Sequence, residues 1–195
     1  MTKPEAPGVS ETRHRMANHQ QLLAALARLR SQRSSDPETA RQLLWMAEAI
    51  SLIGVLERRR IGDDGVDLAA WLVEMAPIWR RRHGPNAPEI LVEAEPILAP
   101  DSAASTLALI VQELVLNALS HGRPFGGGGQ VVVGLRREAD HCVLSVVDDG
   151  SGFLGDAPHE RFGLWLVRSL SSQVRGRFSL SNGPGGVTAR LEFPL

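Results

Sequence analysis

A helix-forming run from Ser105 to Leu119 constrains the fold of this chain more than any other stretch. Its apolar residues recur at three- and four-residue spacing, which predicts one helix face packed against a core. Beside that face, a carboxylate, an amide and an imidazole recur one helical turn apart, at Glu113, Asn117 and His121. Such a row could hold a hydrated cation and a phosphate chain. The same spacing also describes the polar outer face of an ordinary amphipathic helix.

A second polar stretch follows an alternating apolar run and reads Asp148-x-Gly150-x-Gly152. In this order, the two stretches resemble the N box and the G1 box of the GHKL ATPase superfamily. The resemblance implies an ATP-binding domain in which Asp148 accepts a hydrogen bond from the adenine amino group. Asn117 would give one oxygen to Mg²⁺, which takes few protein oxygens, and Glu113 would order the waters of the ion. Gly150 and Gly152 let the backbone approach the nucleotide without a Cβ clash.

Near the N-terminus, Glu11, His14 and Asn18 share one face of a predicted helix. They resemble the H box of a bacterial histidine-kinase class that reads Glu-x-x-His-Arg-x-x-Asn, so the resemblance covers nearly the whole chain from residue 10. It implies that His14 accepts the phosphate, and a neutral imidazole is a competent nucleophile near pH 7. Because Arg15 stands where the commoner kinase class has an acid, the base is left open between Glu11 and no protein base.

The resemblance extends to two further stretches. Arg161-Phe162-Gly163-Leu164 stands where the G2 box of the family reads Gly-Leu-Gly-Leu, and the segment before it, the ATP lid, is short. Arg161 therefore replaces a glycine, although an arginine fork also suits a phosphate. The C-terminal ending that begins at Gly185 resembles that of the same kinase class. The nucleotide-binding residues expected from the resemblance are Asn117, His121, Asp148, Gly150, Gly152, Arg161, Gly163, Leu164 and Thr188, with Asn117 as the metal ligand.

The predicted fold class is α+β, with an N-terminal helical hairpin followed by an α/β-sandwich, Bergerat-type ATP-binding domain. We expect a flexible tail over residues 1–9, a dimerisation and phosphotransfer hairpin over 10–62, and the catalytic domain over 63–195. Asp36 suits the N-cap of the second hairpin helix, with Pro37 at its first position. One hairpin buries little apolar surface, so dimerisation into a four-helix bundle is expected. The apolar stripe on its first helix comprises Met16, Leu22, Leu23, Leu26 and Leu29.

Alternation and helical spacing also divide the predicted catalytic domain into elements. Asp67 can cap a helix that runs to Trp79 and carries Trp71 and Met75 toward the core. The expected strands are 89–95, 130–137, 141–148, 177–181 and 187–193, and a helix is expected over 162–172.

Composition narrows the function classes. The chain has 195 residues, a net charge of −1 and one cysteine, Cys142. The near-neutral charge argues against binding to nucleic acid, and a single cysteine excludes an internal disulfide and fits a reducing compartment. We expect no apolar run of membrane-spanning length and no secretion signal. The sequence therefore predicts a cytoplasmic protein without membrane insertion.

The resemblance implies a histidine kinase of a two-component system that uses ATP and Mg²⁺, and the hairpin favours a homodimer. The γ-phosphate would pass to His14 and then to an aspartate on the receiver domain of a response regulator, and a separate sensor protein could supply the signal. One alternative is a non-catalytic phosphotransfer protein with a degenerate ATPase-like domain, which Arg161 and the short lid favour. The other is an anti-sigma-type serine kinase, which shares the ATP fold but lacks an H-box hairpin.

Overall fold

The computed structural model describes residues 7–62, 64–121, 129–152, 162–183 and 185–195, with side chains from Arg15 onward. The chain divides into two compact units, Met1–Asp63 and Asp64–Leu195. The first unit ends one residue beyond the predicted hairpin range of 10–62.

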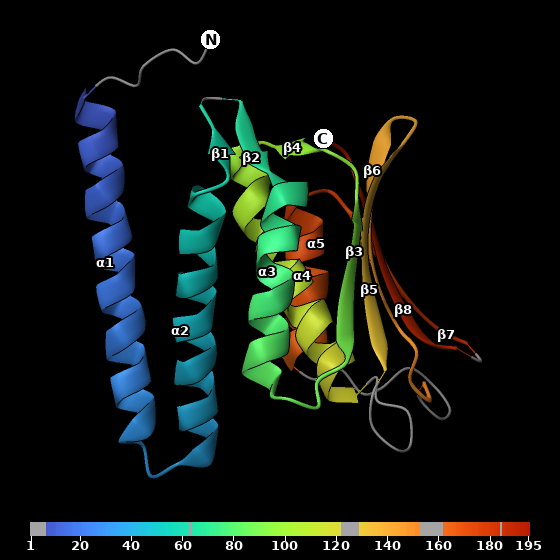
Figure 1. Ribbon diagram of the computed structural model, residues 1–195, viewed down its shortest axis with the longest axis horizontal. Helices are drawn as coiled ribbons and strands as arrows, with labels where there is room; N and C mark the ends of the chain where they lie inside the picture. The colour runs from blue at the N-terminus through green and yellow to red at the C-terminus, as the bar shows by residue number, and fades with distance from the viewer. Residues whose placement is uncertain (1–6, 63, 122–128, 153–161, 184) are drawn as a thin grey trace. The chain divides into compact units, whose positions relative to one another are not determined.

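The first unit is a helical hairpin of α1 (Pro7–Gln32) and α2 (Pro37–Glu57), which lie side by side (Figure 1), followed by the short strand β1 (Arg60–Ile61). The predicted tail was too long, because α1 begins at Pro7; proline is tolerated in the first turn, where its missing N–H has no partner to lose. Asp36 caps α2 as predicted, and its carboxylate accepts hydrogen bonds from the backbone N–H groups of Glu38 and Thr39.

Polar bonds join the two hairpin helices. Arg28 Nη2 donates to Ser51 Oγ over 2.7 Å, and Ser31 Oγ donates to the Ala40 carbonyl over 2.7 Å. The apolar stripe of α1, by contrast, remains largely uncovered within one chain. Each of its members is more than half exposed: Met16, Leu22, Leu23, Leu26 and Leu29.

The second unit is built on a five-stranded sheet of order β3-β5-β6-β8-β7, in which β3 and β5 are parallel and the other neighbours are antiparallel. Its strands lie close to the predicted ranges: β3 (Glu89–Ala94), β5 (Gln130–Glu138), β6 (His141–Asp148), β7 (Arg177–Gly183) and β8 (Gly186–Phe193). A separate antiparallel pair joins β2 (Gly65–Asp67) to β4 (Leu98–Ala99). The sequence did not predict β1, β2 or β4, because strands of two or three residues carry no readable alternation.

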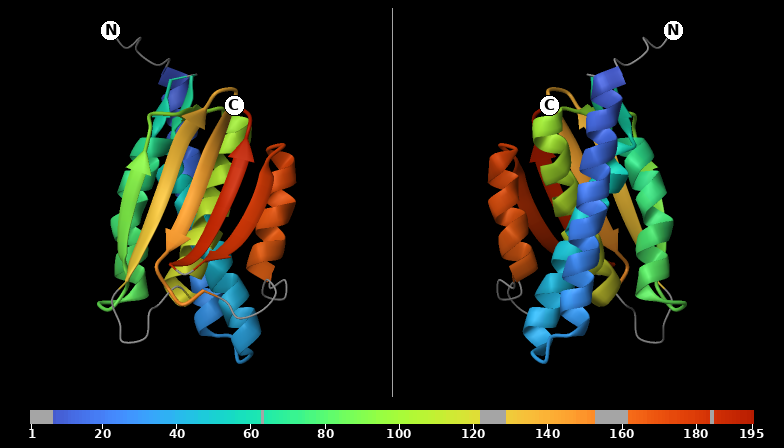
Figure 2. Two further views of the ribbon diagram at one scale, coloured as in Figure 1. Left: turned by 90° about the vertical axis from the view of Figure 1, so that its right-hand side faces the viewer. Right: turned by 90° about the vertical axis from the view of Figure 1, so that its left-hand side faces the viewer.

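Three helices pack on one face of this sheet, as the views from two sides show (Figures 1 and 2): α3 (Leu68–His83), α4 (Asp101–His121) and α5 (Phe162–Gln173). Asp67 caps α3 by accepting a hydrogen bond from the Ala70 N–H over 2.9 Å. Trp71, Met75 and Trp79 are buried, which confirms them as core residues. This helix-on-sheet unit confirms the predicted α+β class; the dimeric four-helix bundle stays a prediction.

The expectation about apolar runs was wrong for α4. Among the described helices, α4 alone is long and apolar enough to cross a membrane by length and composition. The mean hydropathy of an 18-residue stretch within it is 1.5. Within this unit 61% of that stretch is buried. The buried residues of α4 include charged and polar ones, Glu113 and Gln112, as well as the apolar stripe that the sequence predicts.

Candidate functional site

The polar row on α4 meets the start of α5. Glu113 is buried, with 7% of its surface exposed. A Cβ at Gly163 would lie 2.8 Å from Glu113 Oε2, 3.7 Å from Asn117 Nδ2 and 3.9 Å from Asn117 Oδ1. A side chain at position 163 would therefore push the Glu113 carboxylate aside. The structure therefore brings together three residues that the sequence assigned to two separate motifs.

Asn117 carries an unsatisfied polar atom at this point. Its Nδ2 is buried, and no hydrogen-bond partner is found for it among the described residues. A buried donor without a partner is costly in a folded protein, and such groups often await a ligand or water. The amide supplies both a donor that suits a phosphate oxygen and an oxygen that suits Mg²⁺. These residues therefore fit a nucleotide with its metal ion.

Asp148 forms a second part of the site at the end of β6. Its side chain is buried, with 5% exposed, and its Oδ1 accepts hydrogen bonds from the backbone N–H of Gly150 over 3.0 Å and of Val187 over 3.3 Å. No other described residue bonds this carboxylate. Two backbone donors thus fix its orientation through one oxygen, and Oδ2 is left to accept a hydrogen bond from a ligand.

The first residue of β8 is a functional position that the sequence reading missed. Gly186 has a φ of +108°, and a Cβ there would lie 1.9 Å from the Asp148 carbonyl oxygen and 2.8 Å from its Oδ1. Any side chain would therefore displace the aspartate. The paired glycines of the C-terminal ending were the available signal, but only the contact with Asp148 shows why the second one is needed.

Other predicted residues are not brought to this cluster. Thr188 lies opposite Val147 in the β6–β8 register, so strand alternation places it on the other face of the sheet from Asp148. His121 is exposed in the last turn of α4, and Leu164 is half-buried in the first turn of α5. Arg161 lies outside the described residues. Glu11, His14 and Asn18 belong to α1 in the other unit, where Asn18 is exposed and the side chains of the first two lie outside the described residues.

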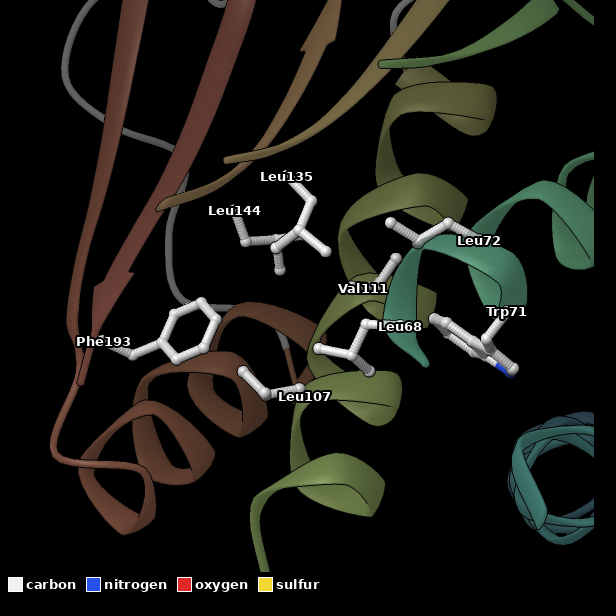
Figure 3. A pocket seen from close by; sticks show the side chains of 8 residues that line it. All are labelled: Leu68, Trp71, Leu72, Leu107, Val111, Leu135, Leu144 and Phe193. Carbon is white, nitrogen blue, oxygen red and sulfur yellow. The ribbon is translucent and has the colours of Figure 1, made fainter. Parts of the chain in front are cut away.

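A small cavity lies elsewhere in the same unit, between α3, α4 and the sheet (Figure 3). Its lining is wholly hydrophobic: Leu68, Trp71, Leu72, Leu107, Val111, Leu135, Leu144 and Phe193. At about 10 Å³ it is at the lower limit for one water molecule. It is therefore a packing gap in the core, and Glu113, Asn117 and Asp148 are not among the residues that line it.

Residues 102–195 match the family described as the histidine kinase-, DNA gyrase B- and HSP90-like ATPases. This segment starts one residue after the first residue of α4 and contains the Glu113–Asn117 row, the Asp148–Gly152 turn and Gly163. Residues 102–195 are therefore similar to the ATPase domains of this family. The ATPase domain implies ATP binding, and its match confirms the resemblance that the N and G1 boxes indicate.

Curated relatives of the whole chain carry histidine-kinase names. The chain is 25% identical over 198 residues to the blue-light-activated histidine kinase 2 of Erythrobacter litoralis, a match that covers 96% of this chain and 57% of the relative. It is 29% identical over 196 residues to the sensor histidine kinase PdtaS of Mycobacterium tuberculosis, with 96% and 39% covered. The chain thus spans 57% of the length of the first relative and 39% of the second.

Solved structures show the same fold beyond the ATPase domain. The histidine kinase domain of an Erythrobacter litoralis blue-light activated histidine kinase matches with a TM-score of 0.71 at 20% identity, over 97% of this chain and 95% of that domain. A longer structure of a kinase so named matches with a TM-score of 0.73 at 22% identity, over 100% and 62%. These matches show that the chain has the fold of histidine-kinase catalytic cores.

Proposed function

We propose that this chain is an ATP-dependent protein-histidine kinase that phosphorylates His14 and then an aspartate on a response regulator. The observation that carries the proposal is the buried Nδ2 of Asn117, which has no partner among the described residues and lies beside Glu113 and Gly163. In a domain of an ATP-binding family, this is the arrangement expected around the phosphates.

The binding roles follow from the chemistry of each group. Asp148 accepts a hydrogen bond from the adenine amino group through its remaining oxygen, which selects a base with a donor at that position. Asn117 would give its amide oxygen to Mg²⁺ and its N–H to a phosphate oxygen, and Glu113 would orient waters of the ion. When bound, Mg²⁺ neutralises charge that develops on the phosphates. Gly163 keeps the space beside these groups open.

In the transfer step, a ring nitrogen of neutral His14 attacks the γ-phosphorus of ATP. A P–N bond forms as the bond from that phosphorus to the bridging oxygen breaks, and ADP leaves with the electron pair. The displaced imidazole proton passes to Glu11 or to water. Asn18, one turn beyond His14 on α1, lies on the face expected to orient the imidazole. Phosphohistidine then gives its phosphoryl group to the carboxylate of a receiver domain.

The proposal includes a cytoplasmic homodimer joined through the α1–α2 hairpin. The exposed stripe of α1 supports it, because a second hairpin would bury five large apolar side chains. Since the chain spans only part of its relatives, a sensor on a separate protein or on further chain could supply the signal.

The test is autophosphorylation with γ-labelled ATP and Mg²⁺, comparing wild type with His14→Gln. His19→Gln is the matched control, because His19 is an exposed histidine on the same helix. We expect an acid-labile, base-stable label that only His14→Gln removes. A folded wild type that binds ATP without labelling would favour a phosphotransfer protein that a regulator loads in reverse. An acid-stable label on a partner's serine would favour the serine-kinase alternative.

Asn117→Ala separates binding from transfer. Loss of the Asn117 amide should reduce Mg²⁺-dependent ATP affinity by about a hundredfold or more, since both a metal ligand and a phosphate donor disappear. Calorimetry measures the affinity, and circular dichroism checks the fold. Unchanged affinity in a folded variant would refute the assigned site.

A further inference from the structure

We propose that Asn182 is a positioning residue for nucleotide binding, which holds the turn from Asp148 to Gly152 in its binding conformation from the β7 side. The inference rests on the proposed function, because it concerns the same nucleotide site. It assigns a role to a strand residue that belongs to none of the N, G1 or G2 boxes.

The first observation is steric. Gly152 has a φ of +69°, and a Cβ built on it would lie 2.0 Å from Asn182 Oδ1, 3.0 Å from Cγ and 3.3 Å from Nδ2. All three nearest atoms therefore belong to one amide. The Asn182 side chain fills the space that a residue with a side chain would need at position 152, so the turn and the amide fit only while residue 152 is a glycine.

The second observation is the strand register. Asn182 pairs with Val187 across the β7–β8 hairpin, one pair before the closing Gly183–Gly186 pair. Val187 is the residue whose N–H donates to Asp148 Oδ1. One cross-strand pair thus contacts both ends of the turn, with Val187 at Asp148 and Asn182 at Gly152.

The opposite side of the turn is also fixed. Asp149 Oδ1 accepts a hydrogen bond from the Gln130 N–H over 2.8 Å, and the Asp149 N–H donates to the Gln130 carbonyl over 3.2 Å. The turn is therefore tied to β5 at Asp149 and bounded by the β7–β8 hairpin at its two ends. Asn182 is exposed, so it adds little to the core, and its contact with Gly152 acts on the shape of the turn rather than on the stability of the sheet.

The experiment is a double-mutant cycle in the full chain, with Gly152→Ala, Asn182→Ala and the double variant. The readouts are the Kd for Mg·ATP by calorimetry and the Tm of each variant. Gly152→Ala should weaken binding about tenfold or more, because the new methyl group displaces the Asn182 amide or the turn. Asn182→Ala alone should weaken binding about threefold with an unchanged Tm. In the Gly152→Ala background, adding Asn182→Ala should lower the Kd for Mg·ATP at least about threefold, because the clash with the amide is removed.

Two glycine variants control for other causes. Gly62→Ala introduces alanine at a comparable φ of +52° with nothing within 4 Å of the new Cβ, so it reports left-handed strain without a clash. Gly185→Ala adds a methyl group in the β7–β8 connection, also with nothing within 4 Å. Both should leave the Kd for Mg·ATP unchanged.

The outcomes separate the two proposals. If Gly152→Ala does not fold, Asn182→Ala still decides, and an unchanged Kd there overturns the positioning role. Losses that simply multiply in the double variant also overturn it while leaving the kinase proposal intact. A wild-type chain that binds no Mg·ATP overturns the proposed function, and the positioning role falls with it.

Discussion

The apolar stripe of α1 and the core of the second unit differ in how far their side chains are buried. The second unit, Asp64–Leu195, contains the segment that matches the ATPase family and is called the ATPase unit below. In this unit, large side chains such as Leu107, Leu135 and Phe193 are fully buried between helices and sheet. In the hairpin, Leu22 and Leu29 are more than half exposed, although they share one helix face. A helix pair has too little area to enclose a core, whereas a sheet with three helices on it has enough. The stripe on α1 therefore needs a second helical layer to cover it, whereas the core of the ATPase unit is complete within one chain.

The largest expected effect tests the hairpin side of this contrast. Replacing Leu22 and Leu29 with Gln should dissociate the dimer, because burying each leucine is worth roughly 1.5–3 kcal/mol and four are lost per dimer. We expect dimer affinity to fall by at least about a hundredfold. Light scattering over a concentration series measures the mass.

The control is Val73→Gln, at a residue of α3 that is exposed to a similar extent. It should leave the mass unchanged. A wild type that stays monomeric at all concentrations would contradict the bundle, and the stripe would then need another cover.

An intermediate effect is expected inside the ATPase unit, where a polar contact is buried in the finished core. Trp79 Nε1 donates to Gln112 Oε1 over 2.5 Å, and Gln112 is 2% exposed. Trp79→Phe leaves this oxygen without its donor, which should lower the free energy of unfolding by about 1–3 kcal/mol. Denaturant melts measure the change.

Two further variants sharpen this test. Trp165→Phe, at a half-exposed tryptophan of α5, should change the free energy of unfolding little. Adding Gln112→Leu to Trp79→Phe removes the orphaned oxygen and should recover part of the loss. No recovery would mean that the indole contributes through packing rather than through its hydrogen bond.

The same contrast explains which parts of the fold could be predicted. Caps and periodicity are local, so Asp36, Asp67 and the long strands were readable from neighbouring residues. The ranges of β5 and β6 were likewise readable, because apolar residues alternate along both. The start of α1 was misplaced because a proline in a first turn looks the same as a proline in a loop.

The site divides in the same way. Spacing on one helix placed Glu113 and Asn117 together, but it could not show that Gly163 closes on them from α5, a contact between distant segments. Gly186 and Asn182 were missed for the same reason, since each acts on a residue more than twenty positions away. Thr188 was assigned from the motif, and only the β6–β8 register revealed which face it occupies.

The smallest expected effect concerns charge on the sheet of the ATPase unit. Glu138 bonds Arg136 through Oε1 over 2.6 Å and Arg190 through Oε2 over 3.1 Å, and the Arg136 bond lowers the pKa of Glu138 below its ordinary value of 4.5. Because the pKa of Glu138 is lower in the folded state than in the unfolded state, the ion pairs stabilise the fold fully above the unfolded-state pKa. This stabilisation is lost as the pH falls through the folded-state pKa. Glu138→Gln should therefore lower the Tm by only about 1–2 °C near pH 6. The difference should shrink as the pH falls below 4.5. A Tm difference that stays constant with pH would show that Glu138 acts through its shape and not through its charge. In the hairpin, the pKa of the cap residue Asp36 is lowered by its bonds to Thr39, so a charge effect is expected there as well.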